Sequence, residues 1–178
     1  MSIQPVAERF WWKIPMDREE VIWVTVAFLW CLFMFFMMPY WHVFGKQNLA
    51  HAAVKTSAEA YMNKANAMVE KYKVREESDL KIPVVRPPAD SDVYLVARLW
   101  IWWPILELEA GKTYRVHLMS MDWLHGFSLQ PENINIQVHP GYDHAVTMTP
   151  TQKGTFAVIC NEYCGVNHHT MISRIYVK

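Results

Sequence analysis

The chain has 178 residues, and its 17 lysines and arginines balance 17 aspartates and glutamates, so that its formal net charge is zero. Without a basic excess to neutralise phosphates, the composition argues against nucleic-acid binding, and a hydrophobic content of 52% argues against disorder. The nine tryptophans fall into two groups, five before residue 42 and four within residues 100–123. The net charge and hydrophobic content of the whole chain are therefore averages over parts that differ in composition.

The N-terminal part predicts a membrane anchor. Residues 1–20 mix both charges with apolar residues and are expected to lie in the membrane surface. The anchor itself is predicted over 21–41, where residues 21–38 carry no charge. Such a run spans about 27 Å as a helix, close to the roughly 30 Å of a bilayer core. A buried core helix or a cleaved signal peptide is the alternative, but the run is too long for a signal peptide and has no small-residue cleavage site.

The next two segments predict a helix and a linker. Residues 45–77 contain no proline and carry apolar residues at alternating spacings of four and three, which predicts one long extramembrane helix. This apolar seam consists of Val54, Ala58, Tyr61, Ala65, Met68 and Tyr72. We expect it to pack on a neighbouring element or another subunit. Residues 78–92 include three prolines and are predicted to be a linker.

Residues 93–178 predict a separate β domain. Short β-branched and aromatic runs alternate with turn signals such as Gly111, Pro140-Gly141 and Gly154. This pattern predicts a small antiparallel sandwich. The eight expected strands cover 93–99, 105–108, 114–119, 127–129, 134–138, 145–149, 155–159 and 173–177.

A metal-binding constellation lies between the last two predicted strands. Cys160, Cys164, His168 and Met171 fall within twelve residues, and thiolate, imidazole and thioether together favour copper. A mononuclear blue-copper loop needs one cysteine, whereas two cysteines four residues apart can bridge two metal ions. His125, just after a predicted strand, offers a second imidazole.

Two other interpretations of this constellation remain open. A Cys160–Cys164 disulfide suits an exported domain, but it closes only a short loop and leaves the histidine and methionine unexplained. A zinc site fits the count of two cysteines and two histidines, although methionine is a poor zinc ligand.

The pattern Cys160-x-Glu162-x-Cys164-Gly-x-x-His168-x-x-Met171, with His125-Gly-Phe upstream, resembles the dinuclear copper A signature of cytochrome c oxidase subunit II. The similarity is greatest to the short form with one transmembrane helix, and it covers residues 93–178 and the anchor. It implies a mainly β fold: a cupredoxin-like Greek-key β-sandwich anchored by one N-terminal transmembrane helix. The predicted helix over 45–77 is an addition to that pattern.

The resemblance also implies a role for each matching residue. Cys160 and Cys164 would bridge two copper ions. His125 and Met171 would complete one copper, and His168 and the backbone carbonyl of Glu162 the other. In many members of the family the carboxylate at the Glu162 position also binds magnesium at the interface with subunit I. No open coordination position remains, so this chain is expected to relay electrons and to carry out no substrate chemistry itself.

The expected function follows from the same resemblance. The chain would take electrons from cytochrome c or another small donor and pass them to haem in subunit I, where oxygen is reduced. An aromatic residue near the copper would receive the electron; the candidates are Trp100, Trp102, Trp103 and Trp123. The copper domain would face the periplasm or cell exterior from a single-pass anchor in the plasma membrane. A nitric oxide reductase subunit and a stand-alone membrane-anchored copper carrier or assembly protein are the alternatives.

Overall fold

The computed structural model describes residues 15–45, 52–77 and 79–178. They belong to two compact units, Met1–Lys46 and Gln47–Lys178. Most of the predicted membrane-surface segment 1–20 lies outside the described residues. The two units are considered separately.

The first unit is the helix α1 (Arg18–Phe44), which extends the predicted span 21–41 by three residues at each end. Asp17 sets its start, because its carboxylate accepts a hydrogen bond from the backbone N–H of Glu20 at 2.7 Å. None of its residues is buried within the chain. The helix is long and apolar enough to cross a membrane.

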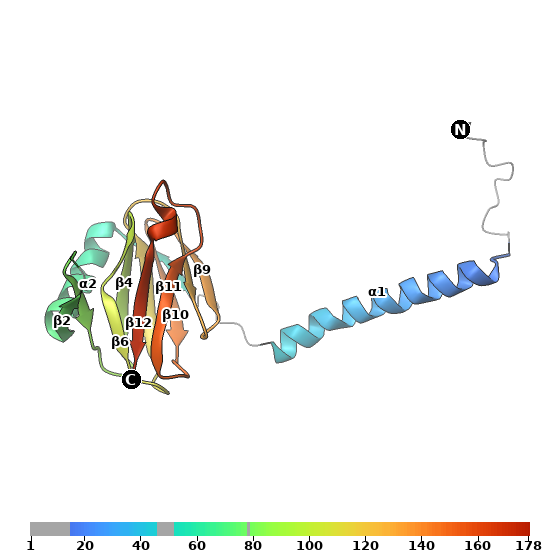
Figure 1. The fold of residues 1–178 in the computed structure, drawn as a ribbon, viewed down its shortest axis with the longest axis horizontal. Coiled ribbons are helices and arrows are strands. Elements are labelled where there is room, and N and C mark those ends of the chain that lie inside the picture. The colour runs from blue at the N-terminus through green and yellow to red at the C-terminus, as the bar shows by residue number, and fades with distance from the viewer. Residues whose placement is uncertain (1–14, 46–51, 78) are drawn as a thin grey trace. The chain divides into compact units, whose positions relative to one another are not determined.

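The second unit is a sandwich of two mixed β-sheets (Figure 1). One sheet has five strands in the order β1-β10-β7-β4-β5, and the other has seven in the order β2-β3-β6-β12-β11-β8-β9. Three neighbouring pairs are parallel (β4 with β7, β6 with β12, and β3 with β6), so the purely antiparallel prediction was wrong. The strands are β1 (Ala52–Lys55), β2 (Lys73–Glu77), β3 (Ile82–Val85), β4 (Asp92–Arg98), β5 (Ile101–Trp103), β6 (Ile105–Leu108), β7 (Tyr114–Ser120), β8 (His125–Leu129), β9 (Ile134–Val138), β10 (Tyr142–Met148), β11 (Gly154–Cys160) and β12 (Ile172–Val177).

Alternation along the strands builds the core between the two sheets. In β4, Val93, Leu95 and Ala97 point inward and are buried. They share one cluster with buried residues of the opposite sheet, including Phe127 and Ile175. The mainly β sandwich expected for residues 93–178 is confirmed, and β5 is the strand that the sequence pattern did not predict.

Among the residues that the structure describes, only part of the predicted helix over 45–77 is helical, and residues 46–51 of that prediction lie outside the described residues. The helix α2 covers only Ala58–Tyr72, with Ser57 as its N-cap, and β1 and β2 flank it. The seam prediction holds inside α2, where Tyr61, Ala65 and Met68 are buried. It fails at Val54, which lies in β1 and is exposed. Pairing of β1 with β10 and of β2 with β3 outweighs the helical periodicity at both ends.

The predicted linker over 78–92 contains a strand of the sandwich. Strand β3 lies between β2 and β6 in the seven-stranded sheet, and both Val84 and Val85 are fully buried. Helix α2 covers the outer face of the five-stranded sheet, where Tyr61 and Ala65 pack against Val96 and Met119. Residues 52–92 are therefore part of the β unit.

A buried carboxylate fastens β2 and the segment after β3 to β6. Glu107 is 1% exposed, and it accepts hydrogen bonds from Arg75 Nη1 at 2.7 Å and from the Arg86 guanidinium. Burial raises the pKa of Glu107, but the hydrogen bonds from the two arginines outweigh it and hold the pKa below its ordinary value. The carboxylate is thus charged when the chain is folded at neutral pH.

Changing Glu107 to Gln is expected to lower the free energy of unfolding by about 1–3 kcal/mol at neutral pH, because a charge-assisted pair is lost while both arginines stay partly solvated. Because the pKa of Glu107 is lower in the folded chain than in the unfolded chain, its contribution to the free energy of unfolding is present above about pH 4.5. That contribution is lost as the pH falls below this value. Denaturant unfolding at pH 7 and pH 3.5 should show the difference between wild type and variant shrinking in acid. The exposed Glu109→Gln variant is the control, and a difference independent of pH would contradict this assignment.

Candidate metal centre

Three neighbouring strands of the seven-stranded sheet bring the predicted ligands to one end of the sandwich. His125 opens β8 and Cys160 closes β11, and these two strands are antiparallel, so that both residues lie at the same end. The loop after Cys160 carries Cys164, then the short helix η2 (His168–Thr170), and returns through Met171 to β12. In Figure 1 this helix lies at the end of the sandwich opposite the C-terminus.

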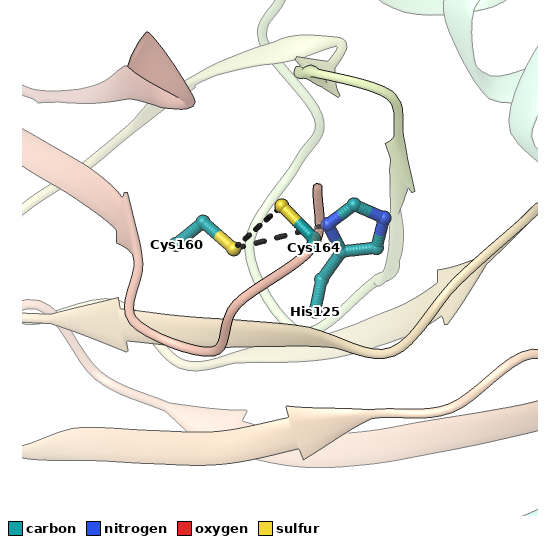
Figure 2. A group of neighbouring side chains, drawn as sticks. All are labelled: His125, Cys160 and Cys164. Carbon is teal, nitrogen blue, oxygen red and sulfur yellow. Dashed lines mark hydrogen bonds between the residues drawn. The ribbon is translucent and has the colours of Figure 1, made fainter. Parts of the chain in front are cut away.

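The two thiols form the middle of the centre. Cys160 Sγ lies 3.6 Å from Cys164 Sγ and 3.8 Å from His125 Nδ1, as Figure 2 shows. Cys164 Sγ in turn lies 3.6 Å from His168 Nδ1 and 3.8 Å from Met171 Sδ. The backbone carbonyl of Glu162 is 3.3 Å from Cys160 Sγ. All six positions singled out by the sequence pattern therefore meet around one pair of sulfur atoms.

The centre is shielded from water, except at His168. His125 and Met171 are fully buried, and Cys160 and Cys164 are 4% and 3% exposed. Burial, and next the hydrogen bond and charge of Cys160, raise the pKa of Cys164 to about 12. This thiol is protonated in the metal-free chain at neutral pH, so a metal ion must displace its proton.

Backbone hydrogen bonds hold the loop in a closed turn. The N–H of Cys160 donates to the carbonyl of Met171 at 3.1 Å, and the N–H of His168 donates to the carbonyl of Gly165 at 3.0 Å. Gly165 has a φ of +110°, which favours glycine. The Trp100 ring lies about 3.5 Å from where a Gly165 side chain would begin. The loop thus brings residues 160 and 171 together while leaving the thiols inside.

Asp122 orients the histidine of β8. Its carboxylate accepts a hydrogen bond from His125 Nε2 at 2.7 Å and others from the backbone N–H groups of Leu99 and Trp123 at 2.7 and 2.6 Å. With Nε2 engaged in this way, Nδ1 is the ring nitrogen that faces Cys160. The sequence pattern did not single out Asp122 as part of the site, although its place three residues before His125 was a usable signal.

The four candidate tryptophans lie in different places. Trp102 is 1% exposed and packs edge-on against Phe127, while Trp103 is half-buried beside the α2 cluster. Trp100 donates its indole N–H to the carbonyl of Cys164 at 3.1 Å, and Trp123 is 64% exposed. Only Trp100 and Trp123 line the apolar hollow that opens beside Cys164; its other lining residues are Leu99, Tyr163, Gly165 and Val166.

The donor set fits copper. The two sulfurs, 3.6 Å apart, are free thiols, so no Cys160–Cys164 disulfide is formed. A buried thioether among the donors favours a soft metal over zinc. Two thiols with one imidazole on each and separate thioether and carbonyl donors offer more ligands than a single tetrahedral ion uses. The chemistry of the set therefore suits copper.

Comparisons with known proteins agree with this geometry. The family profile described as "Cytochrome C oxidase subunit II, periplasmic domain" matches residues 104–177. A protein of Thermus thermophilus, "Cytochrome c oxidase subunit 2", is 35% identical over 92 residues, which cover 51% of this chain and 68% of the relative. The chain belongs to the cytochrome c oxidase subunit II family. Membership of this family implies copper binding and a place among the subunits of an oxidase complex.

Other subunit II relatives match a smaller part of their own length. "Probable cytochrome c oxidase subunit 2" of Streptomyces coelicolor is 40% identical over 74 residues, which cover 42% of this chain and 23% of the relative. A solved chain of a heme-copper terminal oxidase dimer matches 90% of this chain and 100% of its own, with 22% identity and a TM-score of 0.55, which supports the fold. The segment 104–177 contains all six candidate ligands of this subunit II chain and leaves out α2 and β1–β5.

Proposed function

We propose that this chain is the electron-accepting subunit of a membrane haem–copper oxidase that takes electrons from cytochrome c or another small donor. The convergence of six donors on two buried thiols carries the proposal. A copper pair held by these residues would supply reversible one-electron transfer. Cys160 and Cys164 would bridge, His125 and Met171 would complete one copper, and His168 and the Glu162 carbonyl the other.

The chain's own residues favour a relay over substrate chemistry. Every donor is built into a strand or a hydrogen-bonded loop, so the ligand positions need little movement between oxidation states. His125 and Met171 are fully buried, so neither proposed ligand is open to a substrate from the solvent. The electron would continue to haem in subunit I, which is the proposed site of oxygen reduction.

Magnesium, the further cofactor implied by the resemblance, would need ligands from another subunit. Glu162 Oε1 already accepts a hydrogen bond from Gln137 Nε2 at 2.8 Å. In the described part of the chain, the one group of three histidine, cysteine or acidic residues close enough for a metal contains His125, Cys160 and Cys164, without Glu162. Glu162 would thus bring to that ion a carboxylate that already has one hydrogen-bond partner in this chain.

The membrane arrangement is part of the proposal. We place α1 across the plasma membrane as a single span, with the β unit on the periplasmic or outer side, where a small electron donor has access. A reporter enzyme that works only in the cytoplasm, fused after Lys178, should be inactive. Activity of that fusion would reverse the proposed orientation.

Copper loading of the full-length chain in detergent tests the function. We expect two copper ions per chain, an electron-resonance signal shared by both nuclei, and reduction by reduced cytochrome c. A single copper with a blue-protein spectrum would contradict the proposal. With the complete complex, consumption of oxygen but not of nitric oxide is expected during donor oxidation.

Trp123 is the exposed aromatic residue expected to meet the donor. Changing Trp123 to Ala should slow electron uptake from reduced cytochrome c by about tenfold or more, because an exposed aromatic at the centre of an apolar contact commonly contributes about 2 kcal/mol. Stopped-flow mixing measures the rate, and copper content should stay at the wild-type level. Tyr142→Ala, which removes another exposed aromatic, is the control. Equal rates for both variants would place the donor elsewhere.

A further inference from the structure

The two residues that follow Cys160 are tied to the edge strand β9. Asn161 Nδ2 donates to Asn135 Oδ1 at 2.9 Å, and Gln137 Nε2 donates to Glu162 Oε1 at 2.8 Å. Asn135 and Gln137 are two residues apart, so both side chains leave the same face of β9. The start of the metal loop is therefore held at two points by a strand that contributes no ligand.

Glycine at position 126 makes this crossing possible. Strand β8 lies between β11 and β9, and its Gly126 pairs with Gln137. A side-chain carbon on Gly126 would lie 2.1 Å from Asn161 Oδ1 and 2.8 Å from the backbone nitrogen of Glu162. The backbone N–H of Asn161 also donates to the carbonyl of Gly126 at 3.3 Å. The loop thus rests directly on β8 and reaches over it to β9.

The tie at Glu162 bears on a proposed ligand atom. The carbonyl of Glu162 is the donor 3.3 Å from Cys160 Sγ, and it belongs to the residue whose carboxylate Gln137 holds. Glu162 packs closely on Gly126, and its side chain is held by Gln137. These two contacts limit rotation of the Glu162 backbone. The Gln137 contact therefore restrains the residue that carries this carbonyl.

We propose that Gln137 is a positioning residue for the metal centre, acting through the Glu162 side chain to hold the Glu162 carbonyl as a ligand. The inference rests on the proposed function, and it gives the non-ligating edge strand β9 a part in the centre. A weak carbonyl ligand can be lost without losing the copper pair, because the thiolates and imidazoles remain. Loss of the tie should therefore alter the centre rather than abolish it.

The test uses full-length chains loaded with copper in detergent. Gln137→Leu removes the amide at similar size, and we expect it to keep two copper ions, to change the electron-resonance splitting, and to release copper to a chelator about threefold to tenfold faster, the equivalent of one hydrogen bond. Gln152→Leu is the matched control, because Gln152 is also exposed and precedes β11 at the end away from Cys160. It should behave as wild type.

An exchange of the two side chains separates positioning from simple destabilisation. Gln137→Glu alone places two carboxylates together and should loosen copper more than Gln137→Leu does. Adding Glu162→Gln restores the hydrogen bond with its direction exchanged, because position 162 then donates and position 137 accepts. This double variant should bring the spectrum and the copper release rate back toward wild type. If the double variant does not recover, or if Gln137→Leu has the spectrum and release rate of wild type, the inference about Gln137 is wrong. The proposed function would not be affected by either result. A wild-type chain without a copper pair would overturn the proposed function and this inference together.

Discussion

Replacing Cys164 with serine is expected to lower the copper content from two ions to at most one per chain. Cys164 Sγ lies within 3.8 Å of Cys160 Sγ, His168 Nδ1 and Met171 Sδ, so it is one of the two sulfur atoms around which the proposed ligands gather. A serine hydroxyl has nearly the same shape but is a hard and weakly acidic donor, which suits copper poorly. Metal analysis and electron resonance on the full-length chain measure the change.

Cys31 provides the control for this experiment. It is the third free cysteine, lies in α1, and is exposed on that helix. Cys31→Ser should keep two copper ions and the shared signal. Two copper ions and an unchanged shared signal in the Cys164→Ser variant would show that this sulfur is not needed to hold the copper pair, and would contradict its proposed bridging role.

Replacing Asp122 with asparagine is expected to weaken copper binding by about tenfold to a hundredfold, the usual effect of removing a partner that orients a metal-binding histidine. Burial raises the pKa of Asp122, but hydrogen bonds from His125, Trp123 and Leu99 outweigh it and hold the pKa below the ordinary value. The residue is thus a carboxylate with three donors around it. An asparagine has one acceptor oxygen, so at least one of these donors loses its partner or faces an N–H group.

Another aspartate–histidine pair of the same unit is the control. Asp143 contacts His117 Nδ1 at 2.9 Å, and this contact includes none of the proposed ligands. Asp143→Asn should change copper affinity little, as measured by competition with a chelator of known affinity. Equal affinities for wild type and Asp122→Asn would show that the position of His125 does not depend on Asp122.

Local patterns in the sequence were enough for the anchor and for most strands. An uncharged run of 18 residues predicts an apolar helix long enough to cross a bilayer, and strands such as Ile134–Val138 have turn signals at both ends. Strand β3 was missed because its prolines and neighbouring charges suggest a linker, and its burial depends on β6, more than twenty residues later. The ends of the 45–77 helix failed for the same reason, since β1 is defined by pairing with β10.

Five of the six proposed ligand positions could be picked out from the sequence because they share one short loop, whereas His125 lies on the separate strand β8. The residues that surround the proposed ligands were harder to identify from the sequence. Asp122, Gly126 and Gln137 act through contacts between separate strands, and their residue types are common on any β surface. For Gly126, the reason for a glycine is the 2.1 Å approach of Asn161, which only the folded chain reveals. The choice of the exposed Trp123 over the buried Trp102 likewise required knowledge of which side chains reach the surface.

The docking of α2 and β3 has a practical consequence for work on the part of this protein outside the membrane. A fragment that starts near residue 93, where the β pattern begins, would leave Val96 and Met119 without their cover. It would also remove β2 and β3, with the buried Val84 and Val85, from one side of the seven-stranded sheet. A fragment that starts at Gln47 keeps the whole compact unit. The useful cut for a water-soluble, copper-binding piece therefore lies immediately after the anchor, about forty-five residues earlier than the strand pattern alone would place it.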